Sequence, residues 1–158
     1  KISLSVPVYN EREALMPLFE QVQRVMRANY GNDWEIIFVN DGSHDGSEKL
    51  LDDLASKNPE VKVVHFRRNF GQTAAMMAGF DFAQGETIIP LDGDGQNDPE
   101  DIPRIVAKLD ELFFVATVGS IAFSALAPPL RASARSRMSS NPLIFFHFLV
   151  DALATSLS

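Results

Sequence analysis

The chain has 158 residues, of which 46% are hydrophobic and 22% are charged, a composition that suits one folded domain with its own core and argues against disorder. Its net charge of −7 argues against nucleic acid as a partner, because binding phosphates requires a basic face. The lack of cysteine excludes disulfides and thiolate metal sites, and the N-terminal residues predict a strand in place of a signal peptide.

Strand and helix patterns alternate along the first 112 residues. Pro17 lies inside the first helical pattern, which predicts a kink or a late helix start. Asp45 or Ser47 can cap the second helix, and Pro99 is suited to the first turn of the last one. The predicted strands cover residues 2–8, 35–40, 61–66 and 86–91, and the predicted helices cover 11–28, the region around 50–54, 73–83 and 99–111.

This alternation predicts an α/β fold with a mainly parallel sheet and helices on both faces. In such sheets, ligands bind at the carboxyl ends of the strands. Polar residues follow all four predicted strands, at Tyr9 to Glu11, Asp41 to Ser43, Arg67 to Gly71 and Asp92 to Gln96. The four clusters should therefore meet at one edge of the sheet.

Asp92, Asp94 and Gln96 follow the fourth strand at every second position, with glycines between them. One interpretation is an ordinary strand-to-helix turn. The other is a site for a hard divalent cation such as Mg²⁺ or Mn²⁺, which prefers carboxylate and amide oxygens. A closed EF-hand does not fit, since Asn97 replaces the required glycine and Pro103 the bidentate glutamate.

The other strand ends offer groups that suit a nucleotide. Asp41 is either part of a capped turn or an acceptor for a nucleobase or ribose edge. Pro7 and Tyr9 can shape an apolar slot for a base with Glu11 near the ribose, or they can simply end a strand. Arg67 and the arginine that follows it are either solvated or in contact with phosphate.

Other chemistries have no signature in the sequence. The three histidines have no metal-ligand spacing, and the apolar neighbours of His65 in a predicted strand favour packing over catalysis. The sequence contains no legible Ser-His-Asp set, G-x-S-x-G, Walker-type loop or G-x-G-x-x-G.

The segments "VPVYNE", "VNDGSHDGS", "RRNFGQTAAMMAGF" and "PLDGDGQNDPEDIP", in this order and spacing, resemble the family 2 glycosyltransferases. They look most like the polyprenyl-phosphate glycosyltransferases, a subgroup that includes dolichol-phosphate mannosyltransferase and the bacterial undecaprenyl-phosphate sugar transferases. The resemblance covers residues 1 to about 112 and implies a Rossmann-like GT-A fold. Gly93 and Gly95 depart from it, since the subgroup more often has Ala and Leu there.

The resemblance implies a metal-dependent, inverting enzyme that moves a sugar from a UDP- or GDP-sugar to a polyprenyl (undecaprenyl or dolichyl) phosphate at a membrane surface. Its lipid phosphate would be the nucleophile, so no residue is assigned as a catalytic base. Arg67 would contact phosphate, and Mg²⁺ or Mn²⁺ would offset the charge of the leaving diphosphate. The implied metal ligands are Asp92, Asp94 and Gln96, and the implied nucleotide-binding residues are Pro7, Tyr9, Asn10, Glu11, Asp41 and Asp92.

Composition changes near residue 112. Residues 1–112, the expected nucleotide-sugar-binding half, carry a net charge of −9, whereas residues 113–158 carry +2 and form an atypical apolar tail. Residues 112–130 are uncharged over 19 positions, a pattern that suits a buried strand and helix and is borderline for a membrane span. Residues 141–158 suit a membrane-contacting helix.

After Glu111 we expect the resemblance to end, so that the tail is truncated or altered. The expected location is the cytoplasmic face of a membrane, or the cytoplasm if the tail does not contact lipid. Two alternatives stay open: a transferase that acts on polysaccharide or protein, and a catalytically incomplete nucleotide-binding remnant. The sequence does not indicate an oligomeric state.

Overall fold

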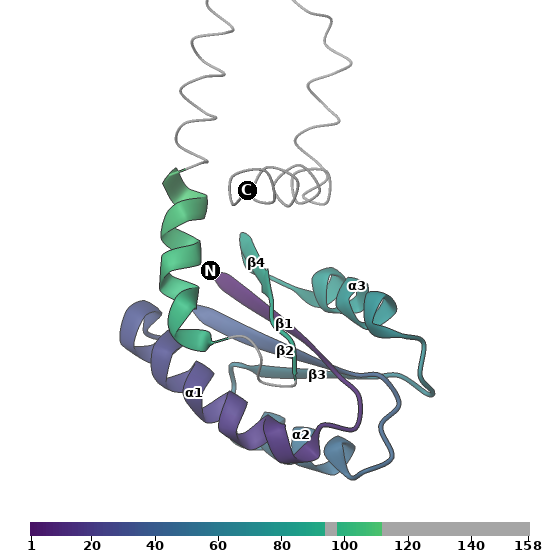
Figure 1. The fold of residues 1–158 in the computed structure, drawn as a ribbon. Helices are drawn as coiled ribbons and strands as arrows, with labels where there is room; N and C mark the ends of the chain where they lie inside the picture. Colours follow the sequence, from purple (N-terminus) through teal and green to yellow (C-terminus); the bar gives the residue numbers. More distant parts are fainter. Residues whose placement is uncertain (94–97, 112–158) are drawn as a thin grey trace, which may run out of the picture. The chain divides into compact units, whose positions relative to one another are not determined.

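The computed structural model describes residues 1–93 and 98–111 (Figure 1). Its helices and strands follow the predicted order, with boundaries that differ by only a few residues. The elements are β1 (Ile2–Val8), α1 (Arg12–Tyr30), β2 (Trp34–Asn40), α2 (Ser47–Lys57), β3 (Val61–His65), α3 (Gln72–Phe82), β4 (Thr87–Pro90), the 3₁₀ turn η1 (Pro99–Asp101) and a helical segment over 102–111.

The four strands form one parallel sheet in the order β3-β2-β1-β4, which confirms the predicted parallel arrangement. The chain moves outward from β1 through β2 to β3 and then returns to the other side of β1 for β4. A crevice therefore opens at the carboxyl ends of β1 and β4, where the direction of winding reverses. Val8 pairs with Asn40 and Asn40 with His65, so three strands end at the same level.

Helices cover both faces of the sheet, as predicted, because side chains alternate along each strand (Figure 1). On β2, Trp34, Ile36 and Phe38 belong to the core under α1 and α2. Their neighbours Ile37 and Val39 instead pack with residues of α3. Every residue of β2 is buried, as expected for a strand covered on both sides.

The helix α3 lies close to the sheet because it presents small residues to β1. Ala75 and Gly79 are its buried positions. A Cβ on Gly79 would collide with the Oγ of Ser5 and lie 3.0 Å from its Cβ, so the lack of a side chain at Gly79 favours this approach. The prediction that this small-residue helix packs closely is therefore confirmed.

Helix starts agree with the predicted capping residues only in part: Gly46 is the N-cap of α2, in place of Asp45 or Ser47, whereas Pro99 lies in the first turn of η1 as predicted. Helix α1 begins at Arg12 and runs through Pro17 to Tyr30, so the helix does not start late. Asp45 Oδ1 accepts hydrogen bonds from the backbone N and the Oγ of Ser47, 3.0 and 2.6 Å away. Asp98 does the same for the backbone N of Glu100 at 3.0 Å.

At the amino end of the strands, a buried carboxylate ties the sheet to the segment after α3. Glu35 is 1% exposed. It accepts hydrogen bonds from Ser3 Oγ (2.6 Å), Gln84 N (2.6 Å), Lys1 Nζ (3.0 Å) and Lys62 Nζ (2.8 Å). Burial raises the pKa of Glu35, but these hydrogen bonds outweigh it and lower the pKa from 4.5 to about 2.

The helices of residues 1–93 and 98–111 are all too short or too polar to cross a bilayer. The predictions made for the apolar tail, residues 113–158, lie outside the described residues.

Candidate functional site

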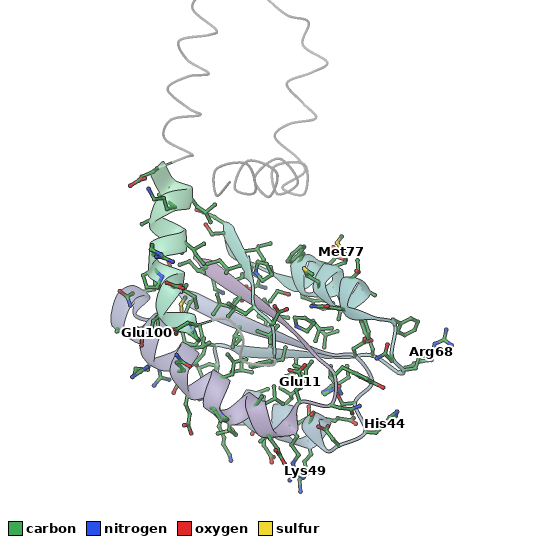
Figure 2. All side chains as sticks on the ribbon, viewed as in Figure 1. Glu11, His44, Lys49, Arg68, Met77 and Glu100 are labelled. Carbon is green, nitrogen blue, oxygen red and sulfur yellow. The ribbon has the colours of Figure 1, made fainter. Side chains whose placement is uncertain are left out.

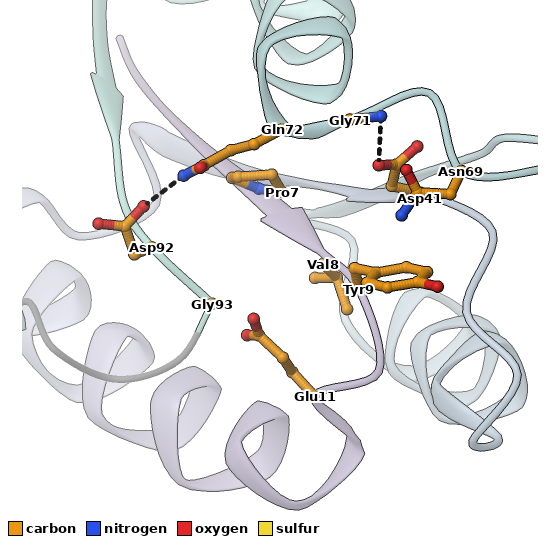
Figure 3. Close-up of a pocket in the computed structure, with 10 residues that line it drawn as sticks. All are labelled: Pro7, Val8, Tyr9, Glu11, Asp41, Asn69, Gly71, Gln72, Asp92 and Gly93. Carbon is orange, nitrogen blue, oxygen red and sulfur yellow. Dashed lines mark hydrogen bonds between the residues drawn. The ribbon is translucent and has the colours of Figure 1, made fainter.

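A cavity of about 280 Å³ opens at the carboxyl edge of the sheet, beside the ends of β1 and β4 (Figure 3). The lining combines the ends of β1, β2 and β4 with the loop between β3 and α3. The lining residues are Pro7, Val8, Tyr9, Glu11, Asp41, Asn69, Gly71, Gln72, Asp92 and Gly93. The fold therefore brings together five residues that the sequence singled out: Pro7, Tyr9, Glu11, Asp41 and Asp92.

Asp41 holds the loop after β3 in place. Its side chain accepts hydrogen bonds from two successive backbone amides, Phe70 N to Oδ1 at 2.7 Å and Gly71 N to Oδ2 at 2.9 Å. The residue is 3% exposed. Since each carboxylate oxygen has a second lone pair, Asp41 retains acceptor capacity toward the cavity while it anchors the loop.

Asp92 and Gly93 bring the end of β4 against the end of β1. Asp92 Oδ1 accepts a hydrogen bond from Gln72 Nε2 at 3.1 Å (Figure 3). A Cβ on Gly93 would lie 2.8 Å from the backbone oxygen of Pro7 and would collide with Glu11 Oε2. The carboxylates of Asp92 and Glu11 therefore line the same cavity as the Asp41 side chain.

Asn10 lies outside the cavity lining and joins two loops. Its backbone has a left-handed φ of 57°, its N donates to Ser43 Oγ at 3.0 Å, and its Oδ1 accepts from His44 N at 2.8 Å. These bonds connect the end of β1 to the end of β2. Contact between Asn10 and a nucleotide stays a prediction.

Asp45 adds a further connection between these two loops. Its Oδ2 accepts a hydrogen bond from the backbone N of Arg12 at 2.9 Å, at the start of α1. Burial raises the pKa of Asp45, but hydrogen bonds from Ser47 and from the Arg12 backbone outweigh it, so the pKa lies below its ordinary value.

The arginines at 67 and 68 are exposed at the same edge and lie outside the cavity lining. Arg68 projects away from the sheet (Figure 2), and its guanidinium lies 4.9 Å from the centroid of the Phe70 ring. Phe70 in turn packs edge-on against Phe66, with ring centroids 5.4 Å apart. A phosphate contact by Arg67 stays a prediction.

The predicted metal ligands Asp94 and Gln96 lie outside the described residues. Within the part that is described, three histidine, cysteine, aspartate or glutamate side chains do not converge anywhere as a metal site would require. The cavity does present hard oxygen donors, the carboxylates of Asp92 and Glu11. This donor chemistry fits Mg²⁺ or Mn²⁺, with Asp92 as the described member of the predicted ligand set.

The sequence did not single out Asn69 and Gln72 as parts of the site. The signal available was the position of the polar segment after the third strand, at the edge where the other strands end. The bond between Gln72 and Asp92 joins residues 20 positions apart and depends on β4 lying beside β1.

Comparisons with known proteins agree with this architecture. A sequence model described as glycosyl transferase family 2 matches residues 3–152, so the match extends past residue 112, where we expected the resemblance to end. Two similar curated proteins are named undecaprenyl-phosphate 4-deoxy-4-formamido-L-arabinose transferase. The one from Klebsiella pneumoniae is 43% identical over 122 residues, and the one from Salmonella paratyphi B is 44% identical over 123. Each alignment covers 77% of this chain and 36% of the relative, so the chain spans about a third of their length.

Two solved structures share the fold at 23% identity. The S. aureus TarS fragment 1–349 in complex with UDP has a TM-score of 0.58, with 70% of this chain and 32% of that one covered. The mannosyltransferase PcManGT from Pyrobaculum calidifontis, in complex with GDP-Man and Mn²⁺, has a TM-score of 0.53, with 63% and 29% covered. These similarities support a GT-A fold.

Proposed function

The chain belongs to glycosyl transferase family 2, and we propose that its cavity binds the nucleotide of a sugar donor whose sugar is transferred to a polyprenyl phosphate. The observation that supports this most is that one cavity at the switch point of the sheet is lined by residues from the ends of β1, β2 and β4. The proposed donors are UDP- and GDP-sugars, because TarS is complexed with UDP and PcManGT with GDP-Man.

The nucleoside lies between the ends of β1 and β2. Tyr9 is 45% exposed and offers apolar ring surface, with Pro7, to a planar base. Asp41 accepts hydrogen bonds from the base, since the loop amides of Phe70 and Gly71 hold its carboxylate in one orientation. Glu11 lies near the ribose.

The diphosphate lies toward the end of β4. Asp92 would hold a divalent cation there together with Asp94 and Gln96, and the cation, when bound, offsets negative charge on the diphosphate. Because several carboxylates face the cavity of a chain with a net charge of −7, a dianionic diphosphate would be repelled without a cation. The ion is Mg²⁺ or Mn²⁺.

The acceptor is a polyprenyl phosphate, as the names of the curated relatives indicate for those proteins. An oxygen of the lipid phosphate forms a bond to the anomeric carbon, while the bond from that carbon to the nucleoside diphosphate breaks with inversion. The phosphate is already anionic, so the reaction does not need a general base. The reaction takes place at the cytoplasmic face of a membrane.

Calorimetric titration of UDP and of GDP, with and without Mn²⁺, tests the binding part of this proposal. We expect metal-dependent binding that weakens at least ~10-fold, about 1.4 kcal/mol, in Asp94→Ala. Asp53→Ala is the matched control, because Asp53 is exposed on α2 and outside the cavity lining. Equal affinity in Asp94→Ala and the unmodified chain would remove Asp94 from the site.

A transfer assay with a panel of nucleotide-sugars and a polyprenyl phosphate tests the reaction itself. Sugar on the lipid phosphate supports the proposal. Transfer to polysaccharide or protein with indifference to the lipid contradicts the proposed acceptor. Metal-dependent nucleotide binding without any transfer contradicts the proposed catalysis by the 158-residue chain and favours the alternative, that this chain is catalytically incomplete.

A further inference from the structure

We propose that His65 is a positioning residue that orients the side chain of Asn40. His65 lies between Asp52 and Asn40, and Asn40 in turn holds the loops that carry Asp41, Tyr9 and Glu11, so these loops keep the shape of the cavity. The link to nucleotide affinity rests on the function proposed above, whereas the link to loop structure does not. From the sequence, His65 was expected only to pack.

Both ring nitrogens of His65 have partners. Nδ1 lies 3.1 Å from Asn40 Nδ2, and Nε2 lies 3.0 Å from Asp52 Oδ1. His65 and Asn40 are register partners at the ends of β3 and β2. The Asn40 residue is 2% exposed, so it cannot exchange these contacts for water at little cost. The Asp52 side chain, by contrast, is 62% exposed, and its bond to His65 contributes little to the stability of the fold.

The backbone amide of Ser43 determines which tautomer His65 adopts. Ser43 N lies 3.0 Å from Asn40 Oδ1 and, as an N–H donor, requires an acceptor there. The Asn40 amide is therefore oriented with Nδ2, which only donates, toward His65 Nδ1. Nδ1 must then be the unprotonated acceptor, and the ring proton resides on Nε2 and is donated to Asp52.

The bonds continue from Asn40 to the cavity. Ser43, whose N–H Asn40 holds, accepts with its Oγ from the backbone N of Asn10 at 3.0 Å. Asn10 lies between Tyr9 and Glu11, which both line the cavity, and its left-handed φ of 57°, which asparagine tolerates, places its backbone N within reach of Ser43 Oγ. Asp41 directly follows Asn40 in the chain. The orientation of the buried Asn40 side-chain amide therefore affects three residues that line the cavity, Tyr9, Glu11 and Asp41.

Two substitutions of similar size separate the two ring nitrogens of His65. In His65→Asn, the side-chain oxygen takes the place of Nδ1 and still accepts from Asn40, while the contact with Asp52 is lost. In His65→Gln, the terminal amide takes the place of Nε2 and still donates to Asp52, while Asn40 loses its acceptor. A role that depended only on side-chain size or on the contact with Asp52 would not single out the variant in which Asn40 loses its acceptor.

Amide hydrogen exchange of the 158-residue chain gives a readout that does not involve nucleotide. We expect exchange at Ser43 N and Asn10 N to be at least ~5-fold faster in His65→Gln than in the unmodified chain, and to change less than ~2-fold in His65→Asn. Nitrogen NMR shifts of the unmodified chain should show His65 protonated on Nε2 and unprotonated on Nδ1 at pH 8. A ring protonated on Nδ1, or equal exchange in the two variants, would overturn the proposed role.

Titration of Mn²⁺ with UDP and GDP then connects the loops to the site. The expected nucleotide affinity is ~10-fold lower in His65→Gln and within ~3-fold of the original in His65→Asn. If the unmodified chain binds neither nucleotide, the proposed function fails, and hydrogen exchange still decides the role of His65. If the chain binds nucleotide and both variants bind equally well, the function stands and the positioning role is refuted.

Discussion

The buried carboxylate of Glu35 connects four donors at the amino end of the sheet, and its neutral replacement is expected to destabilise the fold. Oε1 accepts from Ser3 Oγ and Gln84 N, and Oε2 accepts from the ammonium groups of Lys1 and Lys62. Glu35→Gln keeps the size of the side chain but replaces one oxygen by an NH₂ donor. That donor must face either the two ammonium groups or the other two donors, so at least one pair of donors is opposed.

The magnitude follows from the pKa of Glu35. A decrease from 4.5 in the unfolded chain to about 2 in the folded protein corresponds to about 3 kcal/mol of stability at neutral pH. Because the folded pKa is the lower one, this contribution is present above pH 4.5 and is lost as the pH falls toward 2. Glutamine does not titrate, so the difference in the free energy of unfolding should be about 3 kcal/mol at pH 7 and should disappear at acidic pH.

Urea unfolding, followed by the fluorescence of the single tryptophan, measures this difference at a series of pH values. Trp34 is 3% exposed and neighbours Glu35, so its emission reports unfolding of the sheet. Glu20→Gln is the control, because Glu20 is exposed on α1. A difference between Glu35→Gln and the unmodified chain that stays below about 1 kcal/mol at pH 7, or that does not depend on pH, would refute the reasoning.

Three further changes test the site and its loops. Gly42→Ala should lower the free energy of unfolding, measured in urea, by about 1–3 kcal/mol. Gly42 has a φ of 71°, and a Cβ there would lie 2.5 Å from the carbonyl carbon of Arg68, so unchanged stability would contradict this packing. Asp41→Asn leaves one of the two loop amides facing an NH₂ group, so the free energy of unfolding should fall by about 1–3 kcal/mol in the same assay. Hydrogen exchange at Phe70 N or Gly71 N should become faster, and unaltered exchange at both would count against the anchoring role. Removal of divalent ions with EDTA should weaken UDP or GDP binding at least ~10-fold, as measured by calorimetry, and added Mn²⁺ should restore the affinity. Equal affinity in EDTA would exclude a metal-bridged diphosphate.

Periodicity along the chain was sufficient to predict the order of elements and the covered, parallel sheet. The pattern of β2 predicted a strand buried on both faces, and all seven of its residues are buried. The small residues of α3 predicted a helix packed closely on the sheet. The same reasoning placed Pro7, Tyr9, Asp41 and Asp92 at strand ends. Strand ends share one edge in any parallel sheet, so their joint presence in the cavity was predictable in outline.

The partners of these residues were not predictable, as Asp41 and His65 illustrate. Asp41 was expected either to cap a local turn or to face a ligand, but its oxygens accept from amides 29 and 30 positions later in the chain. His65 was expected to pack, but it bridges Asp52 and Asn40. The spacing of apolar residues is set by each element alone, whereas a hydrogen bond between loops depends on which strands become neighbours.

The local sequence thus determined the type of each element, the face that it buries and the edge at which polar groups gather. The tertiary structure decided the strand order β3-β2-β1-β4, which sets Asp92 and Gly93 beside Pro7 and Glu11 and leaves Asn10 to connect loops outside the cavity. The reason is that burial can be satisfied by several orders of the same strands. Only the assembled sheet fixes the distances over which carboxylates and amides act.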